Sequence, residues 1–208
     1  MEAKIKTELV FIPSPGRGHL LAALEMAKLL VERDQRLSIT VLVIQPFNDP
    51  KSTAHSYNSN SDSRIRFVDL PKVIEPQSNP TASFLSVHTQ FINSHKNHVK
   101  NEVTKIIHSL DSNTSKFRGF VVDMFCTGMI DVANEFNVPT YVFFTSGAAT
   151  LGLILHFQGL LDYQNQDLTV YCWSKLNGLE LNTLLEELKL HQMQELIKEL
   201  SVRNLLSS

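Results

Sequence analysis

The stretch Phe11-Ile12-Pro13-Ser14-Pro15-Gly16-Arg17-Gly18-His19-Leu20 joins a short apolar run to an amphipathic segment. The run Glu8–Ile12 is typical of a buried strand, whereas His19–Arg33 has helical spacing. A strand joined to a helix by such a turn is the repeating unit of open α/β sheets. The turn therefore places His19 beyond the carboxyl end of a strand, where these sheets hold their functional residues. The predicted apolar face of the helix consists of Leu20, Leu21, Leu24, Ala27, Leu29 and Leu30.

The same alternation continues along the chain. We expect four further strands, at Ser38–Gln45, Ile65–Leu70, Phe117–Val122 and Thr140–Phe144. We expect helices at Thr81–Leu110, Thr127–Phe136 and Ser146–Leu161, and loops at Asn48–Ser63 and Lys72–Pro80. Strands that alternate with helices predict a parallel sheet with right-handed crossovers. The fold class is therefore α/β, a Rossmann-like doubly wound sheet over residues 6–165.

The character of the sequence changes after Gln166. A weak strand signal at Leu168–Cys172 precedes a Leu-rich segment, Leu179–Leu200, whose spacing predicts a helix. We therefore divide the chain into a Rossmann-like domain, residues 1–167, and a mostly helical tail, residues 168–208. Exposed leucines favour association, so the tail is expected to dock on the domain or to mediate self-association.

Composition excludes several classes of function. The 208 residues are 43% hydrophobic and 19% charged, with a net charge of -2, so no nucleic-acid partner is expected. The first apolar run stops at Pro13, which is too short for a signal peptide or a membrane span. Cys126 and Cys172 form no metal-binding pattern, and we expect both to be reduced thiols. These features predict a cytoplasmic protein without a metal site.

The turn matches a dinucleotide-binding fingerprint only in part. Leu21 stands where that motif has its third Gly or Ala, and the strand Ser38–Gln45 ends without the acid that binds ribose hydroxyls. Both tests fail, so no NAD or FAD cofactor is expected.

His19 is the best candidate for a general base, because imidazole accepts protons near neutral pH. The first turn of a helix is expected to disfavour imidazolium and to keep the ring neutral. Asp123 ends a neighbouring strand and either orients His19 or caps the following helix. Thr145 or Ser146 either caps the next helix or leaves its N–H groups to a ligand. The residues alone leave these alternatives open.

Three segments together resemble plant family-1 UDP-dependent glycosyltransferases: Ile12 to Leu20, Val121-Val122-Asp123-Met124-Phe125, and Pro139-Thr140-Tyr141-Val142-Phe143-Phe144-Thr145-Ser146-Gly147-Ala148-Ala149. The similarity covers residues 6–165 and is greatest to the subgroup that glucosylates flavonoids and related phenols. It implies the N-terminal half of a GT-B fold, which binds the acceptor, whereas the C-terminal half of the family binds the UDP-sugar.

The resemblance also implies roles for individual residues. His19 would be the base on the acceptor hydroxyl, and Asp123 would orient it. Thr145 and Gly18 would contact the donor. The implied reaction inverts the anomeric carbon, with UDP-sugar as co-substrate and neither metal nor cofactor. The acceptor-binding residues would be Ser14, Pro15 and Phe125.

The sequence departs from the family after about Leu168. Family members are about twice as long, and their Trp-Ala-Pro-Gln and His-Cys-Gly-Trp-Asn-Ser segments for the nucleotide are missing from this sequence. Two functions are therefore expected to compete. One is transfer of a sugar, expected to be glucose, to a small phenolic acceptor, with a donor domain supplied separately. The other is a non-catalytic, truncated protein that binds an acceptor or associates with a relative. A third alternative is an unstable gene fragment without a function.

Overall fold

The computed structural model describes residues 5–46, 62–73 and 84–164. The strand expected at Leu168–Cys172, the helix expected at Leu179–Leu200, and most of both expected loops lie outside these residues. The elements are β1 (Lys6–Ile12), α1 (Arg17–Arg33), β2 (Leu37–Val43), β3 (Ile65–Asp69), α3 (Phe84–Asn93), α4 (Lys96–Ser109), β4 (Ser115–Asp123), the 3₁₀ helix η1 (Thr127–Met129), α5 (Ile130–Glu135), β5 (Thr140–Phe143) and α6 (Ala148–Gln164).

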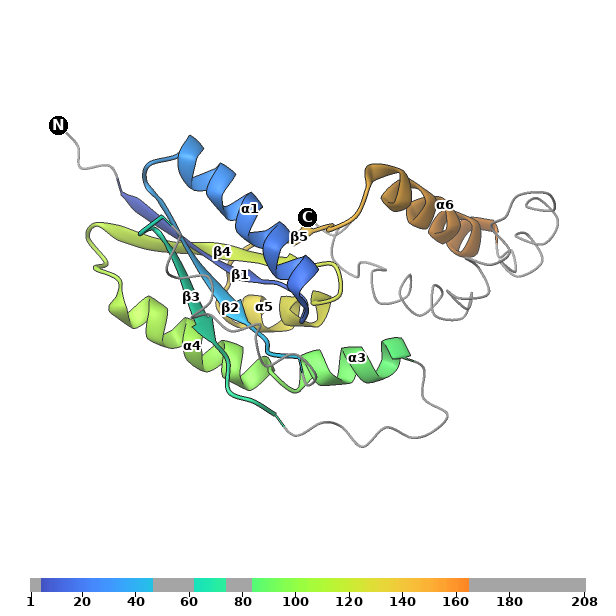
Figure 1. Ribbon diagram of the computed structural model, residues 1–208, viewed down its shortest axis with the longest axis horizontal. Coiled ribbons are helices and arrows are strands. Elements are labelled where there is room, and N and C mark those ends of the chain that lie inside the picture. The colour runs from blue at the N-terminus through green and yellow to red at the C-terminus, as the bar shows by residue number, and fades with distance from the viewer. Residues whose placement is uncertain (1–4, 47–61, 74–83, 165–208) are drawn as a thin grey trace. The chain divides into compact units, whose positions relative to one another are not determined.

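The five strands form one parallel sheet in the order β3-β2-β1-β4-β5. The chain adds β2 and β3 on one side of β1 and then returns to add β4 and β5 on the other side (Figure 1). The strand order thus reverses between β1 and β4, which makes their carboxyl ends a topological switch point. The register pairs Ile12 with Val122, so residues after β1 and at the end of β4 share one edge. The expected Rossmann-like α/β fold is confirmed.

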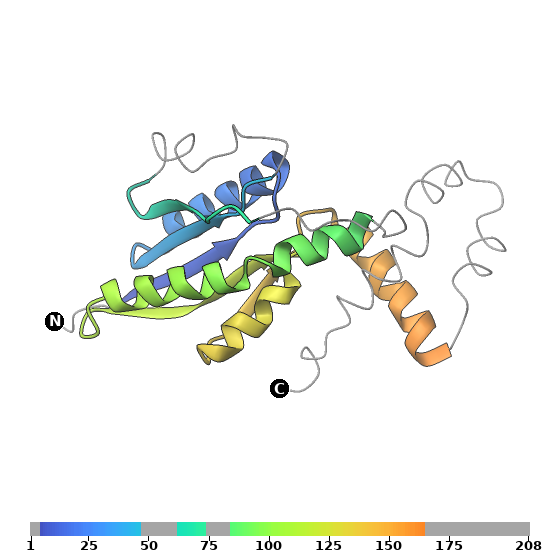
Figure 2. The same cartoon turned by 90° about the horizontal axis from the view of Figure 1, so that it is seen from below.

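Helices cover both faces of this sheet (Figures 1 and 2). Helix α1 packs on one face, where apolar residues of β1, β2 and β3 alternate inward. Helices α4 and α5, with part of α3, pack on the other face. Full burial of one such side chain contributes about 1.5–3 kcal/mol. The first face buries Phe11, Leu20, Ala23, Leu24, Ala27, Val31, Ile39, Val41 and Phe67, and the second buries Val10, Ile12, Leu42, Phe91, Val99, Val103, Phe120, Val122 and Met129.

The single helix expected at Thr81–Leu110 is wrong, because two helices, α3 and α4, occupy this segment. The Phe91 carbonyl accepts the Ser94 hydroxyl at 2.6 Å and His95 Nδ1–H at 2.9 Å. The backbone N–H of His95 instead bonds Ile92 O at 3.0 Å, which tightens the chain into a turn. Side-chain donors therefore take the carbonyl that a continuous helix would use, and the helix is interrupted.

A bulge in β4 brings its backbone close to the loop before β5. Glu8 pairs with Phe117 and Leu9 with Gly119, so Arg118 is an extra residue in the ladder. A Cβ atom at Gly119 would lie 2.5 Å from the Pro139 carbonyl oxygen. Only glycine fits this close approach without displacing the backbone.

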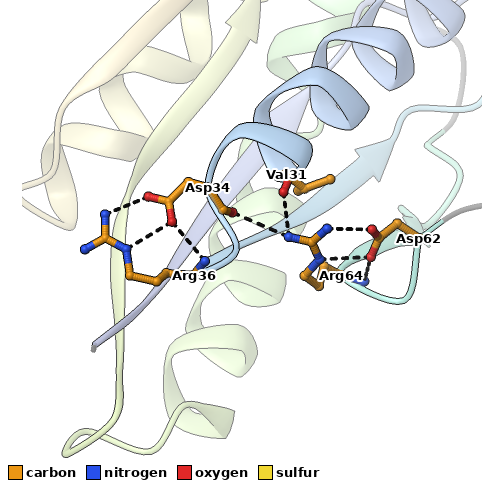
Figure 3. Close-up of polar contacts among 5 residues, drawn as sticks. All are labelled: Val31, Asp34, Arg36, Asp62 and Arg64. Carbon is orange, nitrogen blue, oxygen red and sulfur yellow. Dashed lines mark hydrogen bonds and ion pairs between the residues drawn. The ribbon is translucent and has the colours of Figure 1, made fainter. Parts of the chain in front are cut away.

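Arg64 links the start of β3 to the end of α1 (Figure 3). Its Nη1 donates to the carbonyls of Val31 at 2.6 Å and Asp34 at 3.4 Å. Its Nη2 pairs with Asp62 at 2.7 Å. The carbonyls of the last helical turn lack intrahelical partners, so this side chain satisfies the Val31 carbonyl that α1 leaves open.

The chain divides into two compact units. The first comprises residues 1–79 and 88–145 and contains the whole sheet. The second comprises residues 80–87 and 146–208 and contains α6. The expected boundary between a domain at 1–167 and a tail remains a prediction.

Candidate active site

The turn after β1 fixes the position of His19. Pro13 and Ser14 are buried, and Gly16 precedes α1 with φ of 128°, a conformation that residues with a Cβ rarely adopt. The Gly16 carbonyl accepts the first helical bond, from the Leu20 N–H at 3.1 Å. Helix α1 therefore begins immediately after the glycine and carries His19 in its first turn.

The side chains of His19 and Asp123 meet at the switch point of the sheet. His19 Nδ1 lies 2.8 Å from Asp123 Oδ2. The carboxylate is 1% exposed, whereas the imidazole is 28% exposed. When His19 is neutral and donates its Nδ1–H to this carboxylate, Nε2 carries a lone pair. Nε2 can then accept a proton.

Two further donors hold the Asp123 carboxylate. The Phe125 N–H donates to Oδ1 at 3.0 Å, and the Thr145 hydroxyl donates to Oδ2 at 3.0 Å. The Thr145 oxygen also lies 3.0 Å from His19 Nδ1. Of the two alternatives for Asp123, the structure favours contact with His19. Its local bond goes to Phe125 and not to a helix N-terminus, since η1 has no side-chain cap.

The pKa of His19 is raised above its ordinary value. The hydrogen bond to Asp123 is the largest cause, burial opposes it, and the negative charge of Asp123 adds to it. The expectation that the helix start would disfavour imidazolium is therefore wrong in its net direction. The carboxylate in direct contact raises the pKa of His19 more than burial lowers it, so the net direction is opposite to that expected from the helix start alone.

Phe125 lies beside His19 and closes one side of the site. The two rings meet edge-on, with centroids 5.6 Å apart. Pro15 lies in the turn at intermediate exposure, and Gly18 is exposed in the first turn of α1. No atom lies within 4 Å of a Cβ built on Gly18, so a ligand has room to approach the backbone there.

His88 was not among the residues expected at this site. This residue of α3 belongs to the same compact unit as His19, and its Nε2 lies 3.1 Å from Ser14 Oγ. Its ring also meets Phe125 edge-on, with centroids 5.8 Å apart. Residues 14 and 88 are separated by 74 positions, and no periodicity in the sequence links them. Ser14 is itself only 2% exposed.

Two features are absent from the described residues. Among residues 5–46, 62–73 and 84–164, no three His, Cys, Asp or Glu side chains are grouped as metal ligands would be. Within the same ranges, no helix is both long and apolar enough to cross a membrane. The thiol of Cys126 is free and buried.

Comparison with known proteins gives the site its context. No protein-family profile matches the chain. It is 47% identical over 174 residues to UDP-glucose flavonoid 3-O-glucosyltransferase 6 of Fragaria ananassa, covering 81% of this chain and 35% of the relative. It is 45% identical over 171 residues to UDP-glycosyltransferase 71E1 of Stevia rebaudiana, covering 78% of this chain and 33% of the relative. The chain is homologous to plant UDP-glycosyltransferases.

Solved structures of plant UDP-glycosyltransferases share the fold. UGT71G1 of Medicago truncatula, complexed with UDP-glucose, matches with a TM-score of 0.64 and 37% identity over 78% of this chain and 33% of that one. A UDP-glycosyltransferase of Siraitia grosvenorii, complexed with UDP, matches with a TM-score of 0.57 and 40% identity over 77% of this chain and 33% of that one. The chain thus spans about a third of the length of these UDP-glycosyltransferases and corresponds to their N-terminal part.

Proposed function

We propose that this chain is the acceptor-binding part of a UDP-sugar-dependent glycosyltransferase. Its substrates would be a UDP-sugar, expected to be UDP-glucose, and a small phenolic or flavonoid-type acceptor. The observation that carries the proposal is the contact between His19 and the buried Asp123 carboxylate at the switch point of the sheet. The relatives include a UDP-glucose flavonoid 3-O-glucosyltransferase, which supports the choice of substrates.

In the proposed reaction, His19 Nε2 accepts the proton of the acceptor hydroxyl. The acceptor oxygen forms a bond to the anomeric carbon from the face opposite UDP. The bond between that carbon and the diphosphate oxygen breaks, and its electron pair leaves with UDP. Asp123 stabilises the imidazolium that results and does not take the proton itself. General-base assistance of this kind contributes about a hundredfold to ten-thousandfold in rate.

Thr145 and Gly18 are the residues proposed to contact the donor. The Thr145 hydroxyl lies 3.0 Å from both Asp123 Oδ2 and His19 Nδ1, so a sugar bound there would be next to the base. Open space beside Gly18 leaves its backbone accessible to the same ligand. A few hydrogen bonds of about 0.5–1.5 kcal/mol each do not offset the several kcal/mol that association costs. The UDP-sugar is therefore expected to need a donor-binding domain as well, and no further cofactor is proposed.

The acceptor is proposed to lie against Phe125, with Ser14 and Pro15 at the turn. Phe125 contacts His19 directly, so an aromatic ring stacked there would have its hydroxyl near the base. We also propose a cytoplasmic location. Free thiols such as that of Cys126 are typical of this compartment, where thiols stay reduced.

The test is sugar transfer with the donor domain supplied in trans. The complete 208-residue chain is mixed with the C-terminal part of the Fragaria relative, UDP-glucose and a flavonol, and the glucoside is measured by mass spectrometry. His108, which is exposed near the end of α4, provides the control substitution His108→Ala. Product that depends on His19 but not on His108 supports the proposal. A His19→Ala chain that retains the full rate contradicts it.

A second candidate function is acceptor binding without transfer, either alone or in association with a relative. It requires only the contacts among His19, Phe125, His88 and Ser14, which the described residues provide. The transfer assay and calorimetry together separate the candidates. This second function requires a flavonol to bind the chain in calorimetry, while no glucoside forms when the donor domain is supplied. Self-association through the Leu-rich segment 179–200 is part of this second proposal. Light scattering before and after deletion of residues 176–208 tests it.

A further inference from the structure

His88 is held in a fixed position by a buried serine. Its Nε2 lies 3.1 Å from Ser14 Oγ, and Ser14 is 2% exposed, whereas the His88 ring is only half-buried. Ser14 belongs to the turn that leads to His19, so the two histidines are tied to the same short piece of backbone. Such a hydrogen bond fixes the orientation of the imidazole. The His88 side chain is more exposed than Ser14, so its ring can also contact a ligand.

Phe125 contacts both histidines. The centroid of its ring lies 5.6 Å from that of His19, at an interplanar angle of 72°, and 5.8 Å from that of His88, at 87°. Both contacts are edge-on. A flat aromatic molecule that lies against Phe125 would therefore have one imidazole near each of two positions on its rim.

We infer that His88 binds a second oxygen of a polyhydroxylated aromatic acceptor, and so decides which of its hydroxyl groups lies at His19. The inference rests on the proposed function, since it concerns the same acceptor site. It assigns the two histidines different tasks. His19 removes a proton from one hydroxyl, and His88 recognises another oxygen and sets the orientation of the ring system.

The surroundings of the His88 ring suit recognition and not proton transfer. Its pKa is lowered, mainly by burial and further by the nearby His19, with a smaller opposing effect of Asp123. A neutral imidazole donates one hydrogen bond and carries no charge that would need a counter-ion.

The inference requires a particular tautomer of His88. Its proton must lie on Nε2, so that this N–H is shared between Ser14 Oγ and the acceptor oxygen as a three-centre bond. A serine hydroxyl can accept this bond and still donate elsewhere. Long-range ¹H–¹⁵N correlation spectra of the histidine rings identify the tautomer directly.

The binding test compares chrysin with apigenin, two flavones that differ by one hydroxyl group. Both are titrated into the complete chain by calorimetry. One added hydrogen bond is expected to make apigenin bind about three- to tenfold more tightly. His88→Phe keeps a ring but removes both nitrogens, so it should abolish this difference between the two flavones. His88→Gln, which restores an N–H donor, should recover part of the difference, and His108→Phe serves as the control.

Several outcomes overturn the inference. It fails if the preference for apigenin survives in His88→Phe, or if apigenin leaves the ¹⁵N signal of His88 Nε2 unshifted in the unsubstituted chain. The spectroscopic measurement needs no substitution, so it decides the matter even if His88→Phe does not fold. If neither flavone binds the unsubstituted chain, the proposed function is contradicted together with the inference. If both flavones bind and only the dependence on residue 88 is missing, the proposed function stands and the inference alone fails.

Discussion

Asp123 lies 104 residues after His19 in the chain, yet its Oδ2 is 2.8 Å from His19 Nδ1. The contact exists because β1 and β4 are parallel neighbours and both residues follow the paired ends of these strands. One partner is almost fully buried and the other is partly open to solvent. This arrangement is expected of a general base. The buried carboxylate fixes the orientation of the imidazole, and the partly exposed ring can contact the substrate.

The first prediction concerns the two members of this contact. With a donor domain supplied, His19→Ala should lower the rate of glucoside formation by about a hundredfold or more, because the proton acceptor is lost. Asp123→Asn should lower it less, since an amide oxygen still accepts the Nδ1–H bond but stabilises imidazolium poorly. Steady-state kinetics with UDP-glucose and a flavonol measure both effects. Equal rates for Asp123→Asn and the unsubstituted chain would contradict the role of the carboxylate.

The second prediction concerns the pH dependence of activity. His19 must be neutral to accept a proton, and its pKa is raised above the ordinary value of 6.5. The rate should therefore rise with pH along a limb centred above 6.5. Asp123→Asn removes the main cause of the raised pKa, so the limb should move to lower pH while the plateau falls. NMR titration of the histidine rings gives an independent check, in which His88 should titrate below 6.5.

The third prediction follows from the same pKa shift through its effect on stability. A folded-state pKa above the unfolded value means that the native protein binds the proton more tightly. The stabilising effect of the His19–Asp123 pair is then complete below the ordinary pKa and disappears as pH rises through the raised value. Urea unfolding of the unsubstituted chain and of His19→Ala, at a series of pH values, should show a difference that shrinks in this direction. A difference that grows with pH would exclude this linkage.

The fourth prediction concerns Gly119 in the bulge of β4. Gly119→Ala should destabilise the fold by about 1–3 kcal/mol, because its Cβ would lie 2.5 Å from the carbonyl oxygen of Pro139. Gly152 provides the matched control, since it lies in α6 with no atom within 4 Å of an added Cβ. Gly152→Ala should be neutral or stabilising by up to about 1 kcal/mol. Urea midpoints from circular dichroism compare the two, and a neutral Gly119→Ala would show that the backbone adapts.

The fifth prediction concerns the link between α1 and β3. Arg64→Ala should lower the midpoint of thermal unfolding, because the carbonyl of Val31 loses its donor and that of Asp34 loses one of its two donors. Arg36 also forms an ion pair within its own turn, with Asp34 at 2.7 Å, but no bond from it to helix α1 is seen among the described residues. Arg36→Ala should therefore change the midpoint less. Equal effects of the two substitutions would show that the local ion pairs, and not the link to α1, set the stability.

Local patterns in the sequence were sufficient to predict the five strands and the parallel fold. Strands such as Leu37–Val43 are apolar on both faces, and helices such as Arg17–Arg33 have one apolar stripe. Both patterns depend on neighbours in the chain, as does the turn that brings His19 to the end of β1. His19 and Asp123 could be named as candidates for the same reason, since each follows a strand that could be recognised.

The tertiary structure decided the features that depend on residues far apart in the chain. The contact of His88 with Ser14 joins positions 74 residues apart, and no local pattern predicts it. The same holds for the pKa of His19, because the buried carboxylate that raises it is 104 residues away in the chain. The helix breaks between α3 and α4 because the Phe91 carbonyl accepts hydrogen bonds from side chains and not from the backbone. The spacing of apolar residues contains no information about these hydrogen bonds. Periodicity reports which side chains prefer to be buried, whereas hydrogen bonds and charges in the interior depend on which groups the fold brings within reach of one another.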